Sequence, residues 1–461
     1  MKISLKIRRC AVVTGLVGLS FLSLHSPVLG ETKPAPEPSY NVRGSLSARY
    51  VYRIAELPDQ RFSDQDIYSL LRLDLTSTKE KGFEFHFLGS GRADLDGHQD
   101  QTGFYPLEDT GNAYDRPVQG YLLEAHLDMN KPLPLLTQLR LGRQSGTRDE
   151  LVFFDGLAVD FGNDKVALSL YGGATIYYYE IDNRWGNDTI QGAGLDLTPF
   201  TFSTLSLDYL ETKDKREIAG QQDTLTDRLA SAKLLLRIPP VTRLTGKYRT
   251  INGDPRDVSV RATTVWADAG GNLSAGYFRQ FRAQNELTNE FALFYDVIGR
   301  SSPYESYDVK LRQFIATRIA IDAGYFSRKL LKETDQSVFD KDFSRAFVDV
   351  ELSGCVLAGL SCMAIGEQWK SKNNKYDSMG FDASYAWRRK NGKEAKISVG
   401  TYYSLYKYDY YIDPGVRDKV RTYYLNVQHP FTKAFSMNGG YEYEDSIENY
   451  TTVKVGMRYD F

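Results

Sequence analysis

The sequence has little of the chemistry that several common protein classes depend on. Only 3 of its 461 residues are Cys and only 5 are His, which disfavours a multihaem protein, a disulfide scaffold and a zinc-rich protein. After residue 30 no apolar run reaches about 18 residues, so a bundle of membrane helices is excluded. A membrane β-barrel stays open, because a barrel carries its apolar side chains at alternate positions rather than in runs.

The first 30 residues have the layout of a secretory signal peptide. Four basic residues precede the apolar stretch Ala11–Leu24, and Val28-Leu29-Gly30 offers a cleavage site, so we assign 1–30 to the signal peptide; an uncleaved anchor is the alternative. Residues 31–40 form a Pro-rich, polar tail. The mature chain then carries 53 basic and 59 acidic residues, and this mild acidic excess gives no reason to expect nucleic acid as a partner.

From residue 41 to residue 461 apolar and polar residues alternate. Successive side chains of a strand point to opposite faces, so such segments are apolar on one side and polar on the other. The last segment is the clearest case, with an apolar face made of Val453, Val455, Met457, Tyr459 and Phe461. The same pattern recurs at 71–75, 83–87, 123–127, 205–209, 318–325 and 345–352.

Alternation alone fits a soluble β-sandwich as well as a membrane barrel. Three features favour the barrel: segments long enough for a tilted bilayer crossing, no visible domain break, and aromatic clusters at segment ends. These clusters lie at 177–179, 402–403, 408–411 and 423–424. Only closure satisfies every backbone group of a sheet inside hydrocarbon, so 41–461 is predicted to form an all-β, closed antiparallel transmembrane barrel of about 22 strands, within a range of 20 to 24.

Connections of two lengths alternate along the chain. Compact turns are expected at 162–165, 198–201, 238–240, 268–271, 390–393 and 430–433. Longer polar connections are expected at 94–118, 211–227, 330–340 and 410–418. Short periplasmic turns and longer extracellular loops are the usual arrangement of such barrels. The sequence contains 23 candidate strands, one more than the even number expected. The up-and-down order of strands counted from one end of the chain disagrees with the order counted from the other end between Leu287 and Arg328.

The C-terminal segment resembles the last strand of Gram-negative outer-membrane proteins. The resemblance rests on the terminal Phe461 and on Val453, Val455, Met457 and Tyr459 before it at every second position. It implies an outer-membrane location, contact with outer-membrane lipid and recognition of this strand by the barrel-assembly machinery. The stretches Leu139–Gln144 and Phe153–Leu157 are also similar to porin strands that run from a loop back into the wall.

Charged residues on the polar faces are the candidate functional residues, because fixed charges in a wide wet pore select which ions cross it. The predicted pore-lining residues are Arg72, Asp74, Glu84, His86, Glu124, His126, Arg140, Arg143, Asp160, Asp196, Asp208, Asp296, Lys310, Arg312, Arg318 and Asp322. Both signs are present, so strong ion selectivity is not expected; mutual pairing of these charges is the competing interpretation. The 94–118 connection is long enough to fold inward and narrow the channel, and an exposed surface loop is the equal alternative.

Other chemistry is sparse. His86 with Glu84, and His126 with Glu124 and Asp128, could hold a metal ion from neighbouring strands, but a polar pore wall is the interpretation we favour. Hence no metal and no cofactor are predicted. No nucleophile–base arrangement is recognisable, so an enzyme is not expected. Cys355 and Cys362 flank a hairpin, where an oxidising compartment would allow a disulfide, with two free thiols as the alternative.

The sequence therefore predicts a porin-like channel for passive diffusion of ions or small hydrophilic solutes. A bore of about 22 strands is wide enough to need narrowing or plugging, which leaves a second hypothesis: a barrel that sheathes a periplasmic multihaem cytochrome as part of a porin–cytochrome electron conduit. A third hypothesis is a structural or adhesive barrel whose loops bind a surface ligand.

Overall fold

The computed structural model describes most of the chain from Tyr40 to the C-terminus. The described residues are 40–78, 82–96, 107, 117–146, 148, 150, 152–176, 188–218, 221–238, 241–266, 268, 270–282, 302–335, 342–354, 356–371, 375–403, 421–445 and 449–461. They belong to one compact unit, Tyr40–Phe461. The predicted signal peptide and nearly all of the tail lie outside the described residues.

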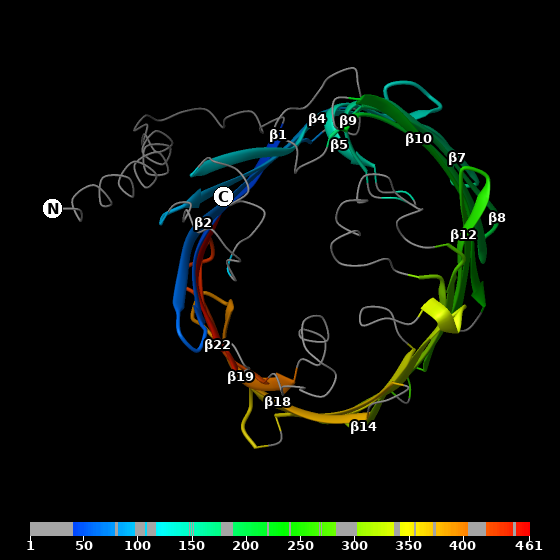
Figure 1. The fold of residues 1–461 in the computed structure, drawn as a ribbon. Helices are drawn as coiled ribbons and strands as arrows, with labels where there is room; N and C mark the ends of the chain where they lie inside the picture. Colours follow the sequence, from blue (N-terminus) through cyan, green and yellow to red (C-terminus); the bar gives the residue numbers. More distant parts are fainter. Residues whose placement is uncertain are drawn as a thin grey trace, which may run out of the picture. The chain divides into compact units, whose positions relative to one another are not determined.

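The unit is built from 22 strands and one short 3-10 turn (Figure 1). The strands are β1 (Tyr40–Glu56), β2 (Arg61–Ser77), β3 (Phe83–Asp94), β4 (Val118–Asn130), β5 (Leu136–Gly146), β6 (Val152–Gly162), β7 (Val166–Thr175), β8 (Thr189–Phe200), β9 (Ser203–Ile218), β10 (Gln221–Ile238), β11 (Thr242–Ile251), β12 (Asp254–Trp266), β13 (Gly271–Gln280), β14 (Tyr304–Ala316), β15 (Ile319–Leu330), β16 (Phe343–Ser353), β17 (Leu360–Ser371), β18 (Lys375–Arg388), β19 (Glu394–Tyr403), β20 (Arg421–Pro430), β21 (Phe435–Asp445) and β22 (Asn449–Asp460). Within the described part of the chain, no helix is long and apolar enough to cross a membrane.

The sheet closes on itself. Each strand pairs antiparallel with its neighbours in the sequence, and β1 pairs with β22 from Ser45↔Asp460 to Glu56↔Asn449. The terminal Phe461 extends this seam, because its backbone exchanges two hydrogen bonds with Gly44 at 2.8 and 2.9 Å. Closure satisfies the edges that an open sheet would leave unpaired, and the predicted closed antiparallel barrel of about 22 strands is confirmed.

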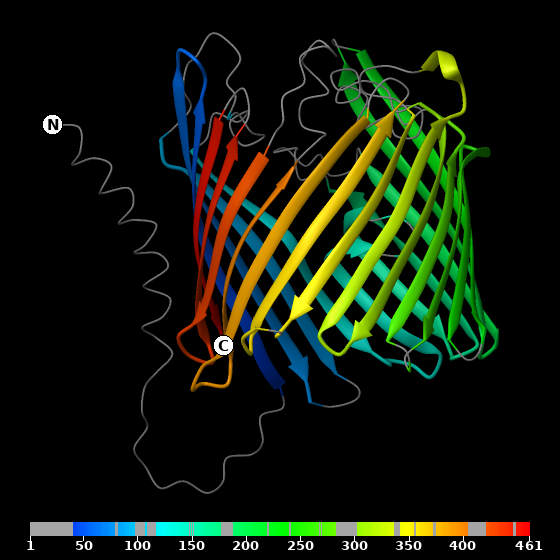
Figure 2. The same cartoon turned by 90° about the horizontal axis from the view of Figure 1, so that it is seen from below.

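The two rims differ in the lengths of their connections. One rim, here the short-turn rim, holds the start of β1, the C-terminus and turns such as 163–165, 201–202 and 431–434. At the opposite rim, here the long-loop rim, β3 ends and β4 begins, β13 ends and β14 begins, and β19 ends and β20 begins, each pair far apart in the sequence. Most of the expected 94–118 connection and all of the expected 410–418 connection lie outside the described residues. Figure 2 shows the tilted strands between these rims, with the C-terminus at the short-turn rim. Of the six compact turns expected from the sequence, those at 162–165, 198–201, 390–393 and 430–433 fall on that rim, and those at 238–240 and 268–271 lie partly outside the described residues.

The predicted alternation holds along the wall. On β16, for example, Val348 and Leu352 are 51% and 41% exposed, while Arg345 and Glu351, on the other face, form ion pairs. The outward apolar face includes Tyr307, Val309, Tyr325, Val399, Tyr423, Leu425, Tyr441, Val455 and Met457. An apolar outer band with aromatic side chains is the surface that a bilayer requires.

Two expectations about the wall are wrong. The 23rd candidate strand has no place, because β13 pairs directly with β14 from Gly271↔Gln313 to Arg279↔Glu305. The 211–227 stretch is not a long loop, because β9 and β10 continue through it and still pair at Ile218↔Gln221. Its residues are polar on both faces, which hid the strand from a pattern that expects one apolar side.

The wall is least tightly paired between β4 and β5. A bulge at Leu88/Gly89 interrupts the pairing of β3 with β4, and β4 pairs with β5 only from Ala125↔Arg143 to Asn130↔Gln138. Toward the long-loop rim the two strands are held by side chains instead. Ser145 donates to Glu124 at 3.0 Å, and Arg143 donates to the carbonyl of Leu122 at 3.0 Å.

Candidate functional site: the lumen wall

The inward face of the barrel carries most of the predicted pore-lining charges. The register relates Arg72, Asp74, Glu84, His86, His126, Arg140, Asp160, Asp196, Asp208, Lys310, Arg312 and Asp322 to one continuous face across the strands. Glu124 stands at the β4 bulge, where it accepts from Ser145. This face is opposite to the exposed apolar one, so it lines the lumen.

Many charges on this face are paired, within one strand or across one or two strands. Arg312 joins Asp322 and Glu351, each at 2.7 Å. Arg261 binds Asp308 at 2.8 Å, and Arg345 pairs with Glu367. Lys310 lies on the same face and is exposed. Partly exposed pairs of this kind contribute at most about 1 kcal/mol each to stability, so their main effect is on the potential inside the lumen.

Four predicted residues either are not on the lumen face of the strands or are not among the described residues. Arg318 is in the short turn between β14 and β15, where it donates to the carbonyl of Gly354 at 2.8 Å. Arg143 is three residues from Arg140 on one strand, so the two cannot share a face; Arg143 binds Asp155 instead, with two bonds of 2.7 Å. Asp296 and Cys355 lie outside the described residues.

The predicted disulfide is not supported. Cys362 is a partly buried free thiol on β17, in register with Leu352 on β16. Since Leu352 belongs to the exposed apolar face, the thiol is on the outer side of the wall.

The connection between β5 and β6 returns to the lumen wall through Arg148. Its guanidinium pairs with Asp208 on β9, binds Asp196 on β8 at 3.0 Å and donates to Ser169 on β7 at 3.1 Å. Burial opposes the charge of this side chain, but the hydrogen bond and charge of Asp208, followed by those of Asp196, raise the pKa of Arg148 above its ordinary value. Arg148 therefore stays a cation at every working pH.

A glycine makes room for this side chain. A Cβ atom on Gly194 of β8 would lie 2.0 Å from Nε of Arg148, far inside van der Waals contact. Because Gly194 has no side chain, the guanidinium approaches the strand closely while it contacts the two carboxylates. The close approach of Arg148 to the wall thus depends on the missing side chain at Gly194 as much as on the carboxylates of Asp208 and Asp196.

Glu150 makes the matching contact further along the wall. One carboxylate oxygen, Oε1, accepts from Arg249 on β11 at 2.8 Å and from Arg256 on β12 at 2.7 Å. Arg249 also binds Asp257 at 2.8 Å. Arg148 and Glu150 therefore contact five strands, β7, β8, β9, β11 and β12. The cation of Arg148 lies beside two carboxylates, and the carboxylate of Glu150 lies between two guanidinium groups.

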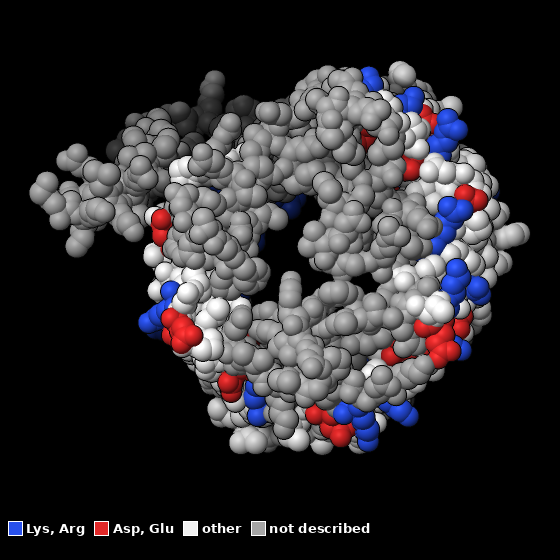
Figure 3. All heavy atoms as spheres, viewed as in Figure 1, with Lys and Arg blue, Asp and Glu red and all other residues white. Residues whose placement is uncertain are grey.

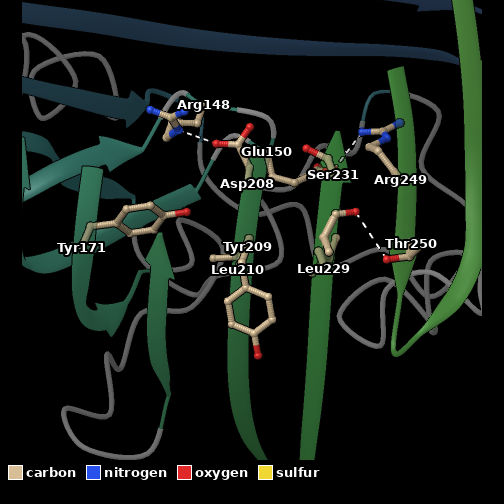
Figure 4. Close-up of a pocket in the computed structure, with 11 residues that line it drawn as sticks. Arg148, Glu150, Tyr171, Asp208, Tyr209, Leu210, Leu229, Ser231, Arg249 and Thr250 are labelled. Atoms are coloured by element: carbon tan, nitrogen blue, oxygen red, sulfur yellow. Dashed lines mark hydrogen bonds and ion pairs between the residues drawn. The ribbon is translucent and has the colours of Figure 1, made fainter. Parts of the chain in front are cut away.

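A pocket lies beside these contacts on the lumen wall. Figure 4 shows Arg148 and Glu150 at its upper edge, with Tyr171 on β7, Asp208 on β9, Ser231 on β10 and Arg249 on β11. The apolar floor continues into a buried cluster of Phe154, Ile190 and Leu210, against which Val152, Ala158, Tyr171 and Leu229 pack. This cluster anchors the lumen side of the wall next to the polar contacts.

The charge around the barrel is mixed. In Figure 3 blue and red side chains of the described residues are interspersed around the rim, and neither sign is confined to one side. The same mixture is present in the pairs of the lumen wall.

Sequence reasoning missed one buried charge cluster near the long-loop rim. Asp66 on β2 is 0% exposed and accepts from Arg53 at 2.8 Å, Arg92 at 2.9 Å and Tyr68 at 3.0 Å. Asp64 binds the same Arg53 at 2.7 Å. Carboxylates at 64 and 66, two residues apart on an alternating strand, were the available signal for a shared face.

Comparison with known proteins identifies the fold and no closer relationship. No family model and no curated protein matches the chain. Among solved structures, the translocation pore of the P pilus usher PapC superposes with a TM-score of 0.50 at 11% identity, covering 90% of this chain and 99% of the usher pore. Pseudomonas aeruginosa OccK8 (OprE) gives a TM-score of 0.42 at 11% identity, covering 91% and 98%. The chain has the fold of an outer-membrane, porin-like β-barrel.

Proposed function

We propose that the barrel is an outer-membrane channel through which ions or small hydrophilic solutes diffuse passively. The observation that carries the proposal is the lumen face, which is polar over the wall and lined with charges of both signs. A barrel of this strand number is too wide for its own wall side chains to fill, and a polar interior retains water. Water, fixed charge and width are all that passive diffusion of a polar solute requires.

The β5–β6 connection supplies the selective element of this channel. Arg148 and Glu150 bring opposite charges onto the wall, anchored by Asp208, Asp196, Arg249 and Arg256. Ions that pass this sector meet fixed charges held by hydrogen bonds rather than mobile side chains.

During biogenesis, the outward residues of β22 are proposed to act as the signal for the barrel-assembly machinery.

Planar-bilayer recording of the purified mature protein tests the proposal. A channel gives stable conductance steps, and proteoliposomes that contain it swell in small sugars. A folded barrel that inserts but carries no current would refute the proposal and favour a sheath around a partner such as a multihaem cytochrome. Heat-modifiable mobility on a gel is the control that the inserted protein is a folded barrel.

A further inference from the structure

Two histidines of the lumen wall lie against each other beside carboxylates. His86 on β3 and His126 on β4 are directly opposite in register, and their rings stack with centroids 4.9 Å apart. One ligand atom from each of His86, His126 and Asp128 lies within 4.8 Å of the others. Glu84 adds a fourth donor, with its Oε2 atom 3.7 Å from Nε2 of His86.

Both imidazoles are oriented by the nitrogen that faces away from this group. Nδ1 of His86 is 2.7 Å from a carboxylate oxygen of Asp74. Nδ1 of His126 is 3.3 Å from the carbonyl oxygen of Arg143. Because both partners are acceptors, each Nδ1 carries the proton and each Nε2 presents a lone pair. Metal-binding histidines are characteristically held in this way, by a carboxylate or carbonyl on the other nitrogen.

The carboxylates also keep lone pairs available. Oδ2 of Asp128 accepts from Gln138 at 2.8 Å and from Arg140 at 3.0 Å, while among the described residues Oδ1 accepts from Arg140 alone, at 2.8 Å. Oδ1 lies 3.8 Å from Nε2 of His126. Glu84 uses its Oε1 atom to accept from Asn130 at 2.8 Å, which leaves Oε2 for another partner. Each carboxylate oxygen accepts two bonds, so within the described contacts Oδ1 of Asp128 and Oε2 of Glu84 keep acceptor capacity beside the imidazoles.

We propose that His86, His126, Asp128 and Glu84 bind one divalent transition-metal ion. Ligand atoms at a tetrahedral zinc ion are separated by roughly 3.3 Å, as follows from bond lengths of about 2.0 Å. Three donor pairs are 3.7 to 4.0 Å apart, and the donors of His86, His126 and Asp128 all lie within 4.8 Å of one another. Binding therefore requires a closure of up to about 1.5 Å at the widest pair, which side-chain rotation supplies. Two imidazoles with two carboxylates suit zinc, copper, nickel or cobalt better than magnesium or calcium.

Charge and access agree with this assignment. Three carboxylates, Asp74, Glu84 and Asp128, stand against two guanidinium groups, Arg72 and Arg140, so the group with neutral imidazoles has an excess of negative charge that a cation offsets. Asp128 and His126 are nearly buried, whereas the side chains of His86 and Glu84 are 26% and 25% exposed. An ion can therefore enter from the lumen near the short-turn rim.

Zinc titration of the mature full-length barrel, without a histidine tag and with its thiols blocked, tests the site. Competition with a chromophoric chelator measures the affinity. We expect one Zn²⁺ per chain in the wild type. His86→Gln and His126→Gln should each weaken binding about 100-fold or more, and Asp74→Asn, which only orients His86, should weaken it about 10- to 100-fold. His429→Gln is the matched control, because His429 packs on Phe431 of another sector, and should bind as the wild type does.

Equal zinc affinity in the wild type and in both histidine variants would overturn the proposal, as would the absence of a stoichiometric site in the wild type. Where a variant fails to show heat-modifiable mobility, X-ray absorption of the zinc-loaded wild type decides instead. Two imidazole ligands support the site, and none or one overturns it. Conductance does not enter this test, so its outcome is independent of the proposed channel function.

Discussion

Removing the charge of Arg148 should make the channel more selective for cations. In the Arg148→Gln variant, the carboxylates of Asp208 and Asp196 keep their place on the lumen wall but lose the guanidinium between them. Glu150→Gln is the matched variant of opposite sign, because it leaves Arg249 and Arg256 without the carboxylate that they share. It should shift the channel toward anions.

The size of the shift follows from one unit of charge near the ion path. At roughly 10 Å in water, two unit charges interact by about 0.4 kcal/mol, which changes the local concentration of a monovalent ion about twofold. Cations and anions respond in opposite directions, so their concentration ratio changes about fourfold. Salt screens this effect within a Debye length of about 10 Å at 0.1 M, so the shift should be largest in dilute salt.

The reversal potential across a KCl gradient measures the permeability ratio for each variant. Arg148→Gln and Glu150→Gln should move it to opposite sides of the wild-type value, and Arg148→Lys, which keeps the charge, should stay close to it. Shifts of the same sign in both charge-neutralising variants, or no shift in dilute salt, would refute the placement of these residues beside the ion path.

Three further variants test separate parts of the structure. Gly194→Val should move the reversal potential in the same direction as Arg148→Gln but by less, because a Cβ would lie 2.0 Å from Nε of Arg148 and displace a guanidinium whose charge is kept, while Gly246→Val, whose Cβ meets nothing within 4 Å, should leave the reversal potential unchanged. Val399→Arg, on the exposed apolar face, should lower the free energy of unfolding in bilayers by about 2–4 kcal/mol, measured by urea titration, whereas Ser398→Arg on the lumen face should change it little; equal losses would contradict the assignment of faces. Asp66→Ala should lower the same free energy by about 3 kcal/mol, because it removes the buried carboxylate that Arg53 and Arg92 share; an unchanged urea midpoint would show that this cluster contributes no stability.

The wall of the barrel was predictable because each strand repeats the same local rule. On β22 and β16 the apolar residues identified from the sequence are the ones on the exposed outer face. The rule fails where a hairpin is polar on both faces, as in the extension of β9 and β10 through 211–227. There the two strands are held by backbone hydrogen bonds, which do not require an apolar face. The sequence of this extension therefore shows no alternation of apolar and polar residues.

The contacts in the lumen were less predictable, because they join residues that are far apart in the sequence. Arg148 and Asp208 are separated by 60 residues, and Glu150 and Arg256 by 106. Such pairs depend on how many strands lie between them and on the register of each, which periodicity does not fix. The histidine group was easier to predict from the sequence, because His86 and His126 lie on consecutive strands and meet in register.

Thiol labelling along β16 tests most directly that one face of the wall is wet and the other lies in lipid. In a background with Cys355→Ser and Cys362→Ser, single cysteines at 345 to 352 are treated with a water-soluble maleimide in intact proteoliposomes. The structure predicts labelling at every second position, strong at Asp349 and Glu351 and weak at Val348 and Val350. Equal labelling on the two faces, or the reverse order, would contradict a water-filled barrel in a membrane.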